Sequence, residues 1–409
     1  MEIKKPNVIL YSIVYILFYP ILKIYFGLKV DRKGYDPPKG PFLVIANHAT
    51  IKDFLIVMLS LYPRLLNAVT AYKYFYQRPL NKFLPVMGCI PKNQFDRDIR
   101  AIFAIKAILK RGDRVLMFPE GRCSIDGAFA GINKTTGKLV KNLGVPVISC
   151  YIEGAYTCMP HWRKGFRAGR ERITISRLFS EEETKTLTAD EINEAIVTRL
   201  NGVDTPPPKK PVRTLSARRL AEGLHNILYW CPKCGSEFKM ETKGNTIHCT
   251  SCGNSAVIDR TAALTPTTGS VMPDSIHGWF GAQAQYETQF LHEDMKPIVL
   301  RVKVRVPSDI PKGEMTHGEG TLRLDPKGWH YDGTLAGEDA ALFFPIDTVP
   351  AAPCDYNDNF QIYSEGRFYK FTPEDSKKCL KYSLIGECAH KRFATRNTLI
   401  TTPAPYQTP

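Results

Sequence analysis

The chain has 409 residues, of which 44% are hydrophobic and 11% aromatic, so its composition excludes a disordered or collagen-like protein. Its net charge of +15 lies in residues 1–210, which carry 33 basic and 18 acidic side chains, whereas residues 211–409 carry 22 of each. The 11 cysteines have no regular spacing along the whole chain, which argues against a secreted disulfide scaffold and favours a reducing, intracellular setting. The length predicts two or three domains.

Residues 8–22 form an apolar run near the N-terminus, and lysines lie on both sides of it (Lys4, Lys5, Lys23 and Lys29). The run is shorter than the roughly 20 residues that a helix needs to cross a bilayer. Positive charge at both ends favours a helix that lies in one leaflet of an anionic membrane surface, which we expect to be a cytoplasmic face. A spanning helix and an ordinary buried helix are the alternatives.

From residue 40 onwards, short apolar runs alternate with helical patterns. Residues 42–46, 114–118 and 145–152 are predicted strands, and residues 98–109 have the apolar spacing of a helix. A Thr-x-x-Glu capping box at residues 188–191 predicts a helix that continues to residue 200 and closes the first domain. This alternation predicts an α/β sheet.

The second half begins with a proline-rich stretch and continues into a β-rich region. Strand, turn and strand patterns occupy residues 320–331 and 360–371, and residues 373–388 are a candidate closing helix. The predicted boundaries are 1–33 for the membrane-associated helix, 34–204 for the α/β domain, 205–228 for a linker, 229–256 for a cysteine-rich unit, 275–394 for the β-rich domain and 395–409 for a disordered tail.

The first candidate site follows the predicted strand 42–46, where His48 and Asp53 lie five residues apart. Catalytic groups favour this end of a strand. A carboxylate that holds one imidazole nitrogen makes the other nitrogen a better base for a substrate hydroxyl, so Asp53 would orient His48. A turn histidine bonded to a helix-capping aspartate is the structural alternative.

A second element follows the predicted strand 114–118, where Glu120, Gly121 and Arg122 occur in sequence. Glycine lets the backbone approach a ligand closely, and arginine offers a planar pair of donors for a phosphate. The motif Gly88-Cys-Ile-Pro-Lys92 lies between the two elements, and Val145-Pro-Val147 follows them.

With these motifs in this order, residues 8–200 resemble the membrane glycerolipid acyltransferases, the family that includes 1-acyl-sn-glycerol-3-phosphate acyltransferase. The segment from His48 to Asp53 matches the His-x4-Asp motif of that family, and Phe118-Pro-Glu120-Gly121 matches its third block. The resemblance implies an α/β acyltransferase domain with His48 as the general base, Asp53 as its orienting carboxylate, and Glu120 and Gly121 at the acceptor site. It also implies an acyl-CoA or acyl carrier protein donor and a lysophospholipid acceptor on a membrane phospholipid surface.

Two departures from the family pattern concern the acceptor phosphate. Gln94 stands where the family has an arginine, and Arg122 precedes the usual arginine position by one residue, which Cys123 occupies. Arg122, Lys92 and Lys134 are the candidate substrate-binding cations; Lys134 could equally be a solvated cation at a helix start. Cys123 is interpreted as a small buried filler rather than a nucleophile, so direct transfer without a covalent acyl-enzyme is expected.

The second candidate site is a metal centre built from Cys231, Cys234, Cys249 and Cys252. These residues form two Cys-x-x-Cys-Gly motifs separated by a predicted hairpin. Four thiolates in such turns predict a structural zinc ribbon, with two disulfides or an iron site as alternatives, and no catalytic metal is expected. The charge neutrality of residues 211–409 argues against nucleic acid as a partner.

The β-rich region loosely resembles the PH or GRAM type of small barrel, which would make it a membrane-binding, peptide-binding or merely supporting domain. The predicted function is transfer of an acyl group to 1-acyl-sn-glycerol 3-phosphate, giving phosphatidic acid in phospholipid biosynthesis. The alternative is a catalytically weak lipid-binding or scaffold protein that acts through the zinc ribbon and the C-terminal domain. The intact His48 and Asp53 pair favours the enzyme.

Overall fold

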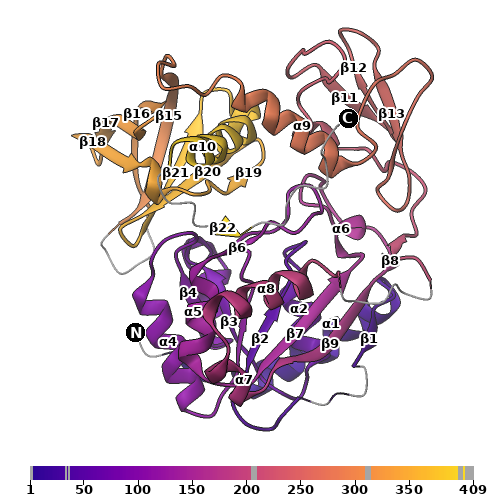
Figure 1. The fold of residues 1–409 in the computed structure, drawn as a ribbon, viewed down its shortest axis with the longest axis vertical. Coiled ribbons are helices and arrows are strands. Elements are labelled where there is room, and N and C mark those ends of the chain that lie inside the picture. The colour runs from indigo at the N-terminus through magenta and orange to yellow at the C-terminus, as the bar shows by residue number, and fades with distance from the viewer. Residues whose placement is uncertain are drawn as a thin grey trace.

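The computed structural model describes residues 3–32, 35, 37–203, 210–308, 315–394 and 399–400. They form a lower α/β domain and an upper part, which holds a small cysteine-rich sheet and a larger antiparallel sheet (Figure 1).

A mixed seven-stranded sheet is the centre of the lower domain. Its order is β1 (Lys29–Asp31), β9 (Arg172–Phe179), β7 (Val147–Glu153), β2 (Leu43–Ala46), β5 (Val115–Met117), β3 (Asn67–Ala71) and β4 (Ile90–Lys92). Neighbours are parallel except β7 and β9. Strand β2 is buried along its whole length, as its continuous apolar sequence requires. The three predicted strands are present as β2, β5 and β7.

Helices pack on both faces of this sheet (Figure 1). The predicted helix at 98–109 is present as α4, and the Asp98 carboxylate caps it by accepting a hydrogen bond from the Ala101 N–H at 3.1 Å. The predicted capping box is present at Thr188 and Glu191. The helices of the domain after the first are α2 (Asp53–Ser60), α3 (Leu80–Val86), α4 (Ile99–Lys110), α5 (Thr135–Leu143), α6 (Ala155–Cys158), α7 (Glu181–Thr186) and α8 (Ala189–Leu200), with a 3-10 turn η1 at Tyr72–Tyr76.

Helix α1 (Val8–Ile24) occupies the apolar N-terminal run. One face buries Tyr11, Val14 and Leu22 beside α2, and the Tyr11 hydroxyl donates to the Met58 carbonyl at 3.2 Å. The rest of the helix surface exposes Val8, Ile9, Ile13, Ile16, Leu17, Phe18, Ile21 and Ile24. Among the residues described, none of the helices is both long and apolar enough to cross a bilayer.

Most of the predicted linker 205–228 is part of the fold. Residues 204–209 lie outside the described residues, but β10 (Arg213–Thr214) pairs with β8 (Gly169–Arg170) of the α/β domain. Beyond it, Leu220, Leu224 and Leu228 are buried in the core. The proline pattern ends at Pro211, and the apolar residues after it drive this segment into the fold.

The cysteine-rich unit is a four-stranded antiparallel sheet. It consists of β11 (Met240–Lys243), β12 (Thr246–Cys249), β13 (Ser255–Ile258) and β14 (Leu264–Pro266). Strands β11 and β12 form the hairpin that the sequence predicts between the two cysteine pairs.

The C-terminal domain is a seven-stranded antiparallel sheet with a long helix after it. The strand order is β18 (Glu338–Pro345), β17 (Gly328–Leu335), β16 (Met315–Asp325), β15 (Ile298–Pro307), β21 (Arg367–Pro373), β20 (Asn359–Ser364) and β19 (Cys354–Asp355). The closing helix α10 (Cys379–Phe393) begins later than predicted, because Pro373 ends β21 and a short turn intervenes. Whether this domain is of the PH or GRAM type stays a prediction.

Helix α9 (Ile276–Thr288) precedes this sheet and corrects the expectation that the region is β-rich from its start. Its Trp279 and Gln283 side chains are fully buried, so packing outweighs the low helix propensity of its two glycines. The tail 395–409 lies outside the described residues apart from β22 (Leu399–Ile400), which pairs with β6 (Ile132–Asn133).

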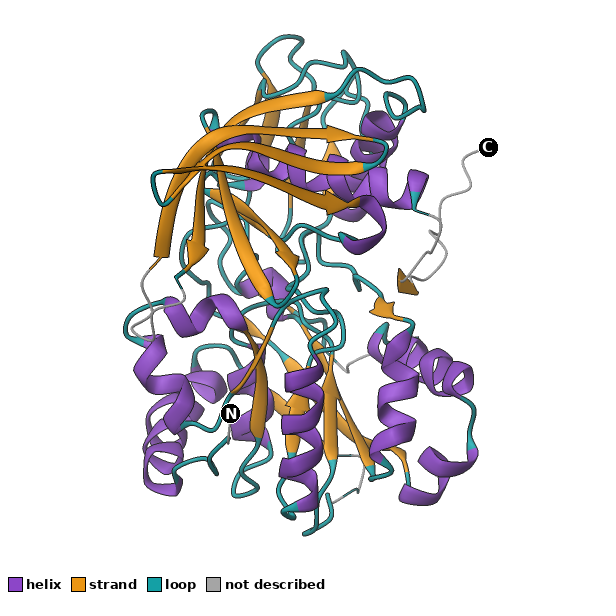
Figure 2. Ribbon diagram, turned by 90° about the vertical axis from the view of Figure 1, so that its left-hand side faces the viewer, coloured by secondary structure: helices purple, strands orange, loops and turns teal. Residues whose placement is uncertain are grey.

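The C-terminal domain sits directly on the α/β domain. Figure 2 shows its sheet as a curved layer above the lower domain, with helices along one side. The β20–β21 turn contacts the loop before α4, where the Asn93 amide donates to the Gly366 carbonyl and the Gly366 N–H donates to Asp96, both at 2.9 Å. A single hydrophobic cluster includes Trp162 of the lower domain, Ile247 of the cysteine unit and Phe371 of the C-terminal sheet. All three parts therefore share a core.

Candidate active site

His48 and Asp53 meet at the carboxyl end of β2. His48 lies in the loop after that strand, and Asp53 is the first residue of α2. The Asp53 carboxylate lies 3.2 Å from His48 Nδ1 and accepts hydrogen bonds from the Thr50 N–H and hydroxyl, each at 2.7 Å. Asp53 is fully buried. Its oxygens are therefore held in one orientation and fix the imidazole in turn.

The imidazole of His48 is also fixed from the side. Its ring stacks on Phe118 with 4.2 Å between the ring centroids. Burial acts to lower the pKa of His48, but the electrostatic contribution of the neighbouring Cys123 and the hydrogen bond to Asp53 outweigh it, so the pKa lies well above 6.5.

Glu120 supports the loop that carries His48. One of its carboxylate oxygens accepts from the His48 N–H at 2.6 Å and the other from the Ala130 N–H at 2.8 Å. The residue is 4% exposed, and burial raises the pKa of its carboxyl to about 7. Its geometry is that of a group that positions two loops.

Gly121 and Gln94 connect this loop to the C-terminal domain. Gly121 has a φ of +72°, which only glycine adopts without strain. Its carbonyl accepts a hydrogen bond from the Gln94 amide, and the Gln94 carbonyl oxygen accepts one from the Tyr363 hydroxyl at 2.8 Å. Gln94 therefore links the Glu120 loop to β20.

The three candidate phosphate-binding cations have different surroundings. Arg122 pairs with Glu387 of α10, with 3.0 Å between Nη2 and Oε2. The Lys92 ammonium donates to the carbonyls of Asn93 and Asp96, and burial lowers its pKa. Lys134 is exposed at the start of α5, and in the described part of the chain no hydrogen bond joins its ammonium to His48 or Glu120.

Cys123 contacts His48, although the sequence suggested only a filler role for it. Its Sγ lies 3.4 Å from His48 Nε2 and 3.9 Å from Nδ1. The side chain is partly exposed. The signal available in the sequence was its place in the Glu120 motif, but the distance to His48 depends on how β2 and β5 pair.

The four cysteines of the second candidate site converge. Their sulfur atoms all lie within 4.8 Å of one another, with 3.7 Å between Cys231 and Cys252 and 3.8 Å between Cys234 and Cys249. Tetrahedral S4 coordination at about 2.3 Å requires sulfur separations of about 3.8 Å, so the group could hold a metal ion. Gly235 and Gly253 each have a φ of +72°, and their N–H groups donate to the carbonyls of Cys231 and Cys249 at 2.9 Å.

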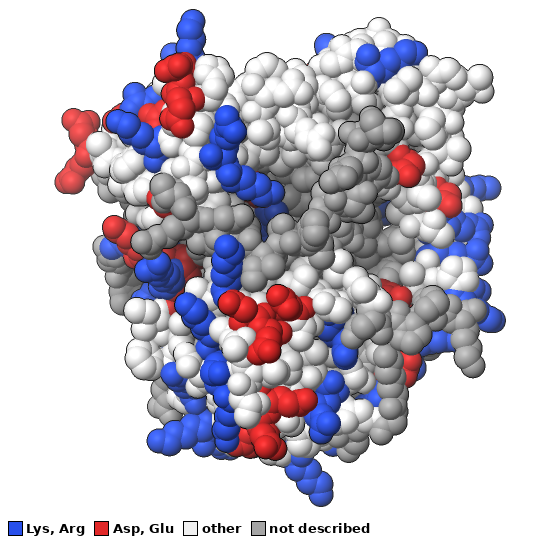
Figure 3. All heavy atoms as spheres, viewed as in Figure 1, with Lys and Arg blue, Asp and Glu red and all other residues white. Residues whose placement is uncertain are grey.

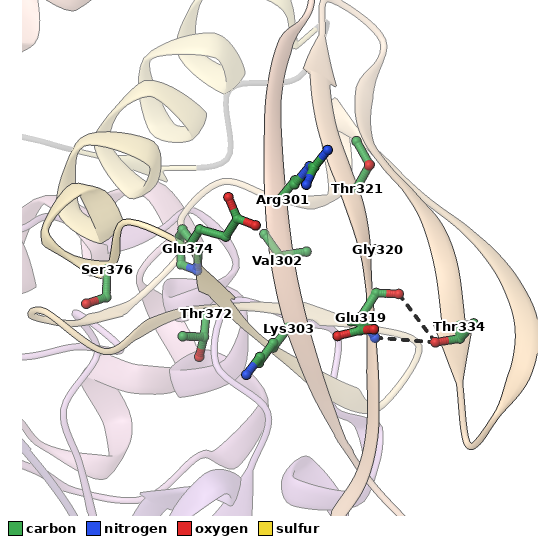
Figure 4. A pocket seen from close by; sticks show the side chains of 11 residues that line it. Arg301, Val302, Lys303, Glu319, Gly320, Thr321, Thr334, Thr372, Glu374 and Ser376 are labelled. Carbon is green, nitrogen blue, oxygen red and sulfur yellow. Dashed lines mark hydrogen bonds between the residues drawn. The ribbon is translucent and has the colours of Figure 1, made fainter.

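A hollow of about 850 Å³ lies on the C-terminal domain between β15, β16 and β21 (Figure 4). Basic and acidic side chains both line it, including Arg301, Lys303, Glu319 and Glu374. Its lining contains no residue of the His48 or cysteine sites, so it belongs to neither.

Comparisons with known proteins find similarity in the α/β domain. Residues 27–153 match the Acyltransferase family model, and this range contains His48, Asp53, Glu120 and Cys123. A 1-acyl-sn-glycerol-3-phosphate acyltransferase from Chlamydomonas reinhardtii is 23% identical over 181 residues, covering 42% of this chain and 52% of that protein. The chain thus spans about half the length of this curated relative.

Among solved structures, the crystal structure of the 1-acyl-sn-glycerophosphate acyltransferase PlsC from Thermotoga maritima is similar to this chain at 18% identity, with a TM-score of 0.36. The similarity covers 49% of this chain and 98% of that one.

Proposed function

We propose that the protein transfers an acyl group from an acyl thioester, carried by coenzyme A or acyl carrier protein, to the hydroxyl of a lysophospholipid. The proposed acceptor is 1-acyl-sn-glycerol 3-phosphate and the product phosphatidic acid. The observation that carries this proposal is the His48 and Asp53 pair at the end of β2, inside the region that matches the acyltransferase family model.

The reaction needs a base, an orienting group and a route for the leaving thiol. Neutral His48 accepts the proton of the acceptor hydroxyl at Nε2, because Asp53 holds Nδ1. The alkoxide of the acceptor attacks the thioester carbonyl carbon. The carbon–sulfur bond of the donor then breaks, and the imidazolium gives its proton to the leaving thiolate. Glu120 keeps the His48 backbone in place during these steps.

Arg122 is the proposed partner of the acceptor phosphate. A guanidinium binds two phosphate oxygens in a planar arrangement, as it binds the two oxygens of Glu387 in this structure. We infer that the acceptor phosphate replaces the Glu387 carboxylate when substrate enters. Lys92 and Lys134 remain proposed contributors to the positive potential of the acceptor site.

The proposed membrane contact is an apolar N-terminal surface, which consists of the exposed face of α1 together with Phe166. Phe166 is 57% exposed, and its ring centroid lies 5.7 Å from that of Tyr25. Basic side chains gather along the right-hand edge of Figure 3 at mid-height, where Figure 1 places β8. Phe166 lies three residues before that strand. Apolar area next to cations suits an anionic lipid surface, and we propose a cytoplasmic membrane face.

Zinc is the proposed occupant of the four-cysteine site, with a structural role. Tetrathiolate sites whose positions are all filled by protein stabilise a fold, and zinc in such a site supplies folding free energy rather than chemistry. The shared hydrophobic core carries that stability to the C-terminal domain.

The decisive experiment assays purified protein against a panel of lysolipids with acyl-CoA and acyl carrier protein donors. We expect His48→Ala to lower the rate about 10²- to 10⁴-fold, whereas His292→Ala, at an exposed position, keeps it. Thermal unfolding of both variants checks the fold. No transfer from any donor to any acceptor would favour the lipid-binding or scaffold alternative.

A further inference from the structure

We propose that Lys52 and Glu171 are positioning residues of the His48 site. Their buried ion pair fixes the end of the loop that follows β2, and so holds the Asp53 carboxylate at the imidazole. This proposal rests on the proposed acyl transfer and adds to it two residues that act through Asp53.

The ion pair joins two segments that are 119 residues apart in the chain. Lys52 directly precedes Asp53, the first residue of α2, and Glu171 lies between β8 and β9. The Lys52 ammonium donates to the Glu171 carboxylate, and both side chains are buried. The ammonium also lies 4.1 Å from the centroid of the Phe26 ring. A carboxylate and an aromatic ring together therefore hold the ammonium in one place.

Glu171 is a fixed partner because its own backbone is held. Its N–H donates to the Phe26 carbonyl at 3.1 Å, and its carbonyl accepts from the Lys29 N–H at 2.9 Å. Strand β1, which begins at Lys29, pairs with β9 in the central sheet. The Lys52 side chain is thus tied to the sheet, and an anchor on a regular element is more precise than one on a loop.

The loop that carries His48 is fixed at its other end as well. The Asn47 amide donates to the Ile152 carbonyl at 2.9 Å and accepts from the Ile152 N–H at 2.7 Å. Hydrogen bonds inside the loop hold the Asp53 carboxylate relative to its neighbours, whereas Lys52 ties it to a distant segment. With both ends fixed, the separation of 3.2 Å between Asp53 and His48 Nδ1 is set by the fold.

Stability alone does not account for a charged pair at this place. Removing an ammonium and a carboxylate from water is costly, and apolar side chains of similar volume often stabilise such a site equally well or better. Burial raises the pKa of the Glu171 carboxyl, and the Lys52 ammonium acts against that rise. An ion pair supplies a directional contact that two apolar side chains do not, and this contact is what positions the residue that follows Lys52.

The anchor also contacts the part of the molecule that we assign to the membrane. The Phe26 ring centroid lies 5.9 Å from that of Phe166, which belongs to the apolar N-terminal surface. Phe26 therefore contacts both that surface and the Lys52 ammonium. Vesicle sedimentation accompanies each rate measurement below, so that a change in membrane binding is separated from a change in catalysis.

The first test replaces the ion pair by apolar side chains, as Lys52→Met with Glu171→Leu. We expect the Tm to stay the same or rise, because the two buried charges are removed together. We expect kcat to fall about tenfold to 10²-fold, because Asp53 is no longer held at the imidazole. The KM for lysophosphatidic acid should stay within about twofold, because the pair acts on the reaction and not on binding.

The matched control is Lys185→Met with Glu181→Leu, which removes an exposed pair of the same residue types on α7. It should keep the wild-type kcat and KM. Phe26→Leu is a second variant for the anchor, because it removes only the ring beside the ammonium and keeps apolar volume. We expect it to lower kcat about threefold.

The second test needs no substrate. The hydrogen bond and the charge of Asp53 both raise the pKa of His48, so a displaced carboxylate lowers it. Heteronuclear NMR titration of the His48 ring should therefore show a lower midpoint in the Lys52 and Glu171 double variant than in wild type. The control pair on α7 should leave the midpoint in place.

A double variant that keeps its Tm and more than about half of the wild-type kcat would overturn the positioning role. An unchanged His48 midpoint, in the double variant or in Phe26→Leu if the double variant unfolds, would overturn it as well. Wild-type protein that transfers no acyl group to any lysolipid would instead overturn the proposed function. The NMR titration would still decide whether Lys52 and Glu171 position Asp53.

Discussion

Glu387 of α10 forms an ion pair with Arg122, a residue 265 positions earlier in the chain and next to the thiol that contacts His48. The Arg122 side chain is 18% exposed and that of Glu387 10%. A pair so deeply buried leaves a costly unpaired charge when one partner is removed alone. Through this ion pair, the C-terminal domain holds the Arg122 side chain, which we propose binds the acceptor phosphate.

Removing this carboxylate should favour phosphate-bearing acceptors. In Glu387→Gln, the Arg122 guanidinium loses its competing anion, so we expect the KM for lysophosphatidic acid to fall about threefold to tenfold relative to that for a neutral monoacylglycerol. The ratio of the two KM values is the readout, because an effect on KM that is common to both acceptors cancels in it. Glu293→Gln, at an exposed position, is the matched control. An equal rise of both KM values would show that Glu387 only holds the domains together.

Asp53 should control the protonation of His48. The pKa of His48 lies well above 6.5, and both the hydrogen bond and the charge of Asp53 raise it. Asp53→Asn removes that charge, so the imidazole should lose its proton at a lower pH than in wild type. Turnover should fall about 10²-fold or more, because the tautomer is no longer fixed.

Heteronuclear NMR titration of the His48 ring measures the first effect, and a pH–rate profile measures the second. Asp190→Asn, which replaces an exposed carboxylate in the first turn of α8, should change neither. A His48 titration midpoint that stays in place in Asp53→Asn would contradict the assigned role of the carboxylate.

Metal removal should increase the mobility of more than the cysteine-rich unit. We expect about one zinc per chain, and Cys234→Ser or a strong chelator should remove it. Ile247 of the ribbon lies in the same cluster as Trp279 of α9, and the Gln283 side chain of α9 accepts from the Tyr229 N–H at 2.9 Å. Amide hydrogen exchange should therefore rise in the ribbon and in α9, with β2 and α2 unchanged.

Elemental analysis of protein prepared under reducing conditions tests the metal itself. Cys354→Ala, a partly exposed cysteine outside the cluster, should keep both the metal and the exchange pattern. Protein that contains no metal yet shows full protection in the ribbon would refute the structural role.

The sequence predicted local geometry well and long-range contacts poorly. His48 and Asp53 lie five residues apart, where one loop enters α2, and each cysteine pair closes one turn with a glycine after it, so spacing alone carries the geometry. The Arg122 and Glu387 pair and the approach of Cys123 to His48 join segments far apart in the chain. No local pattern encodes them. Helix α9 was missed for the related reason that tertiary burial of Trp279 decides its structure.

Membrane binding should depend on the exposed face of α1 while the buried face keeps the fold. Ile16 and Leu17 are 67% and 58% exposed, so Ile16→Asp with Leu17→Asp removes insertable apolar area without opening the core. Two such side chains are worth about 3 kcal/mol or more in burial, which predicts at least about tenfold weaker sedimentation with anionic vesicles. High salt should weaken the remaining binding, because the cations act through screened charge. The matched control is Ile99→Asp with Phe103→Asp on α4, equally exposed at 62% and 66%, and a loss of binding in that variant instead would place the membrane contact on α4.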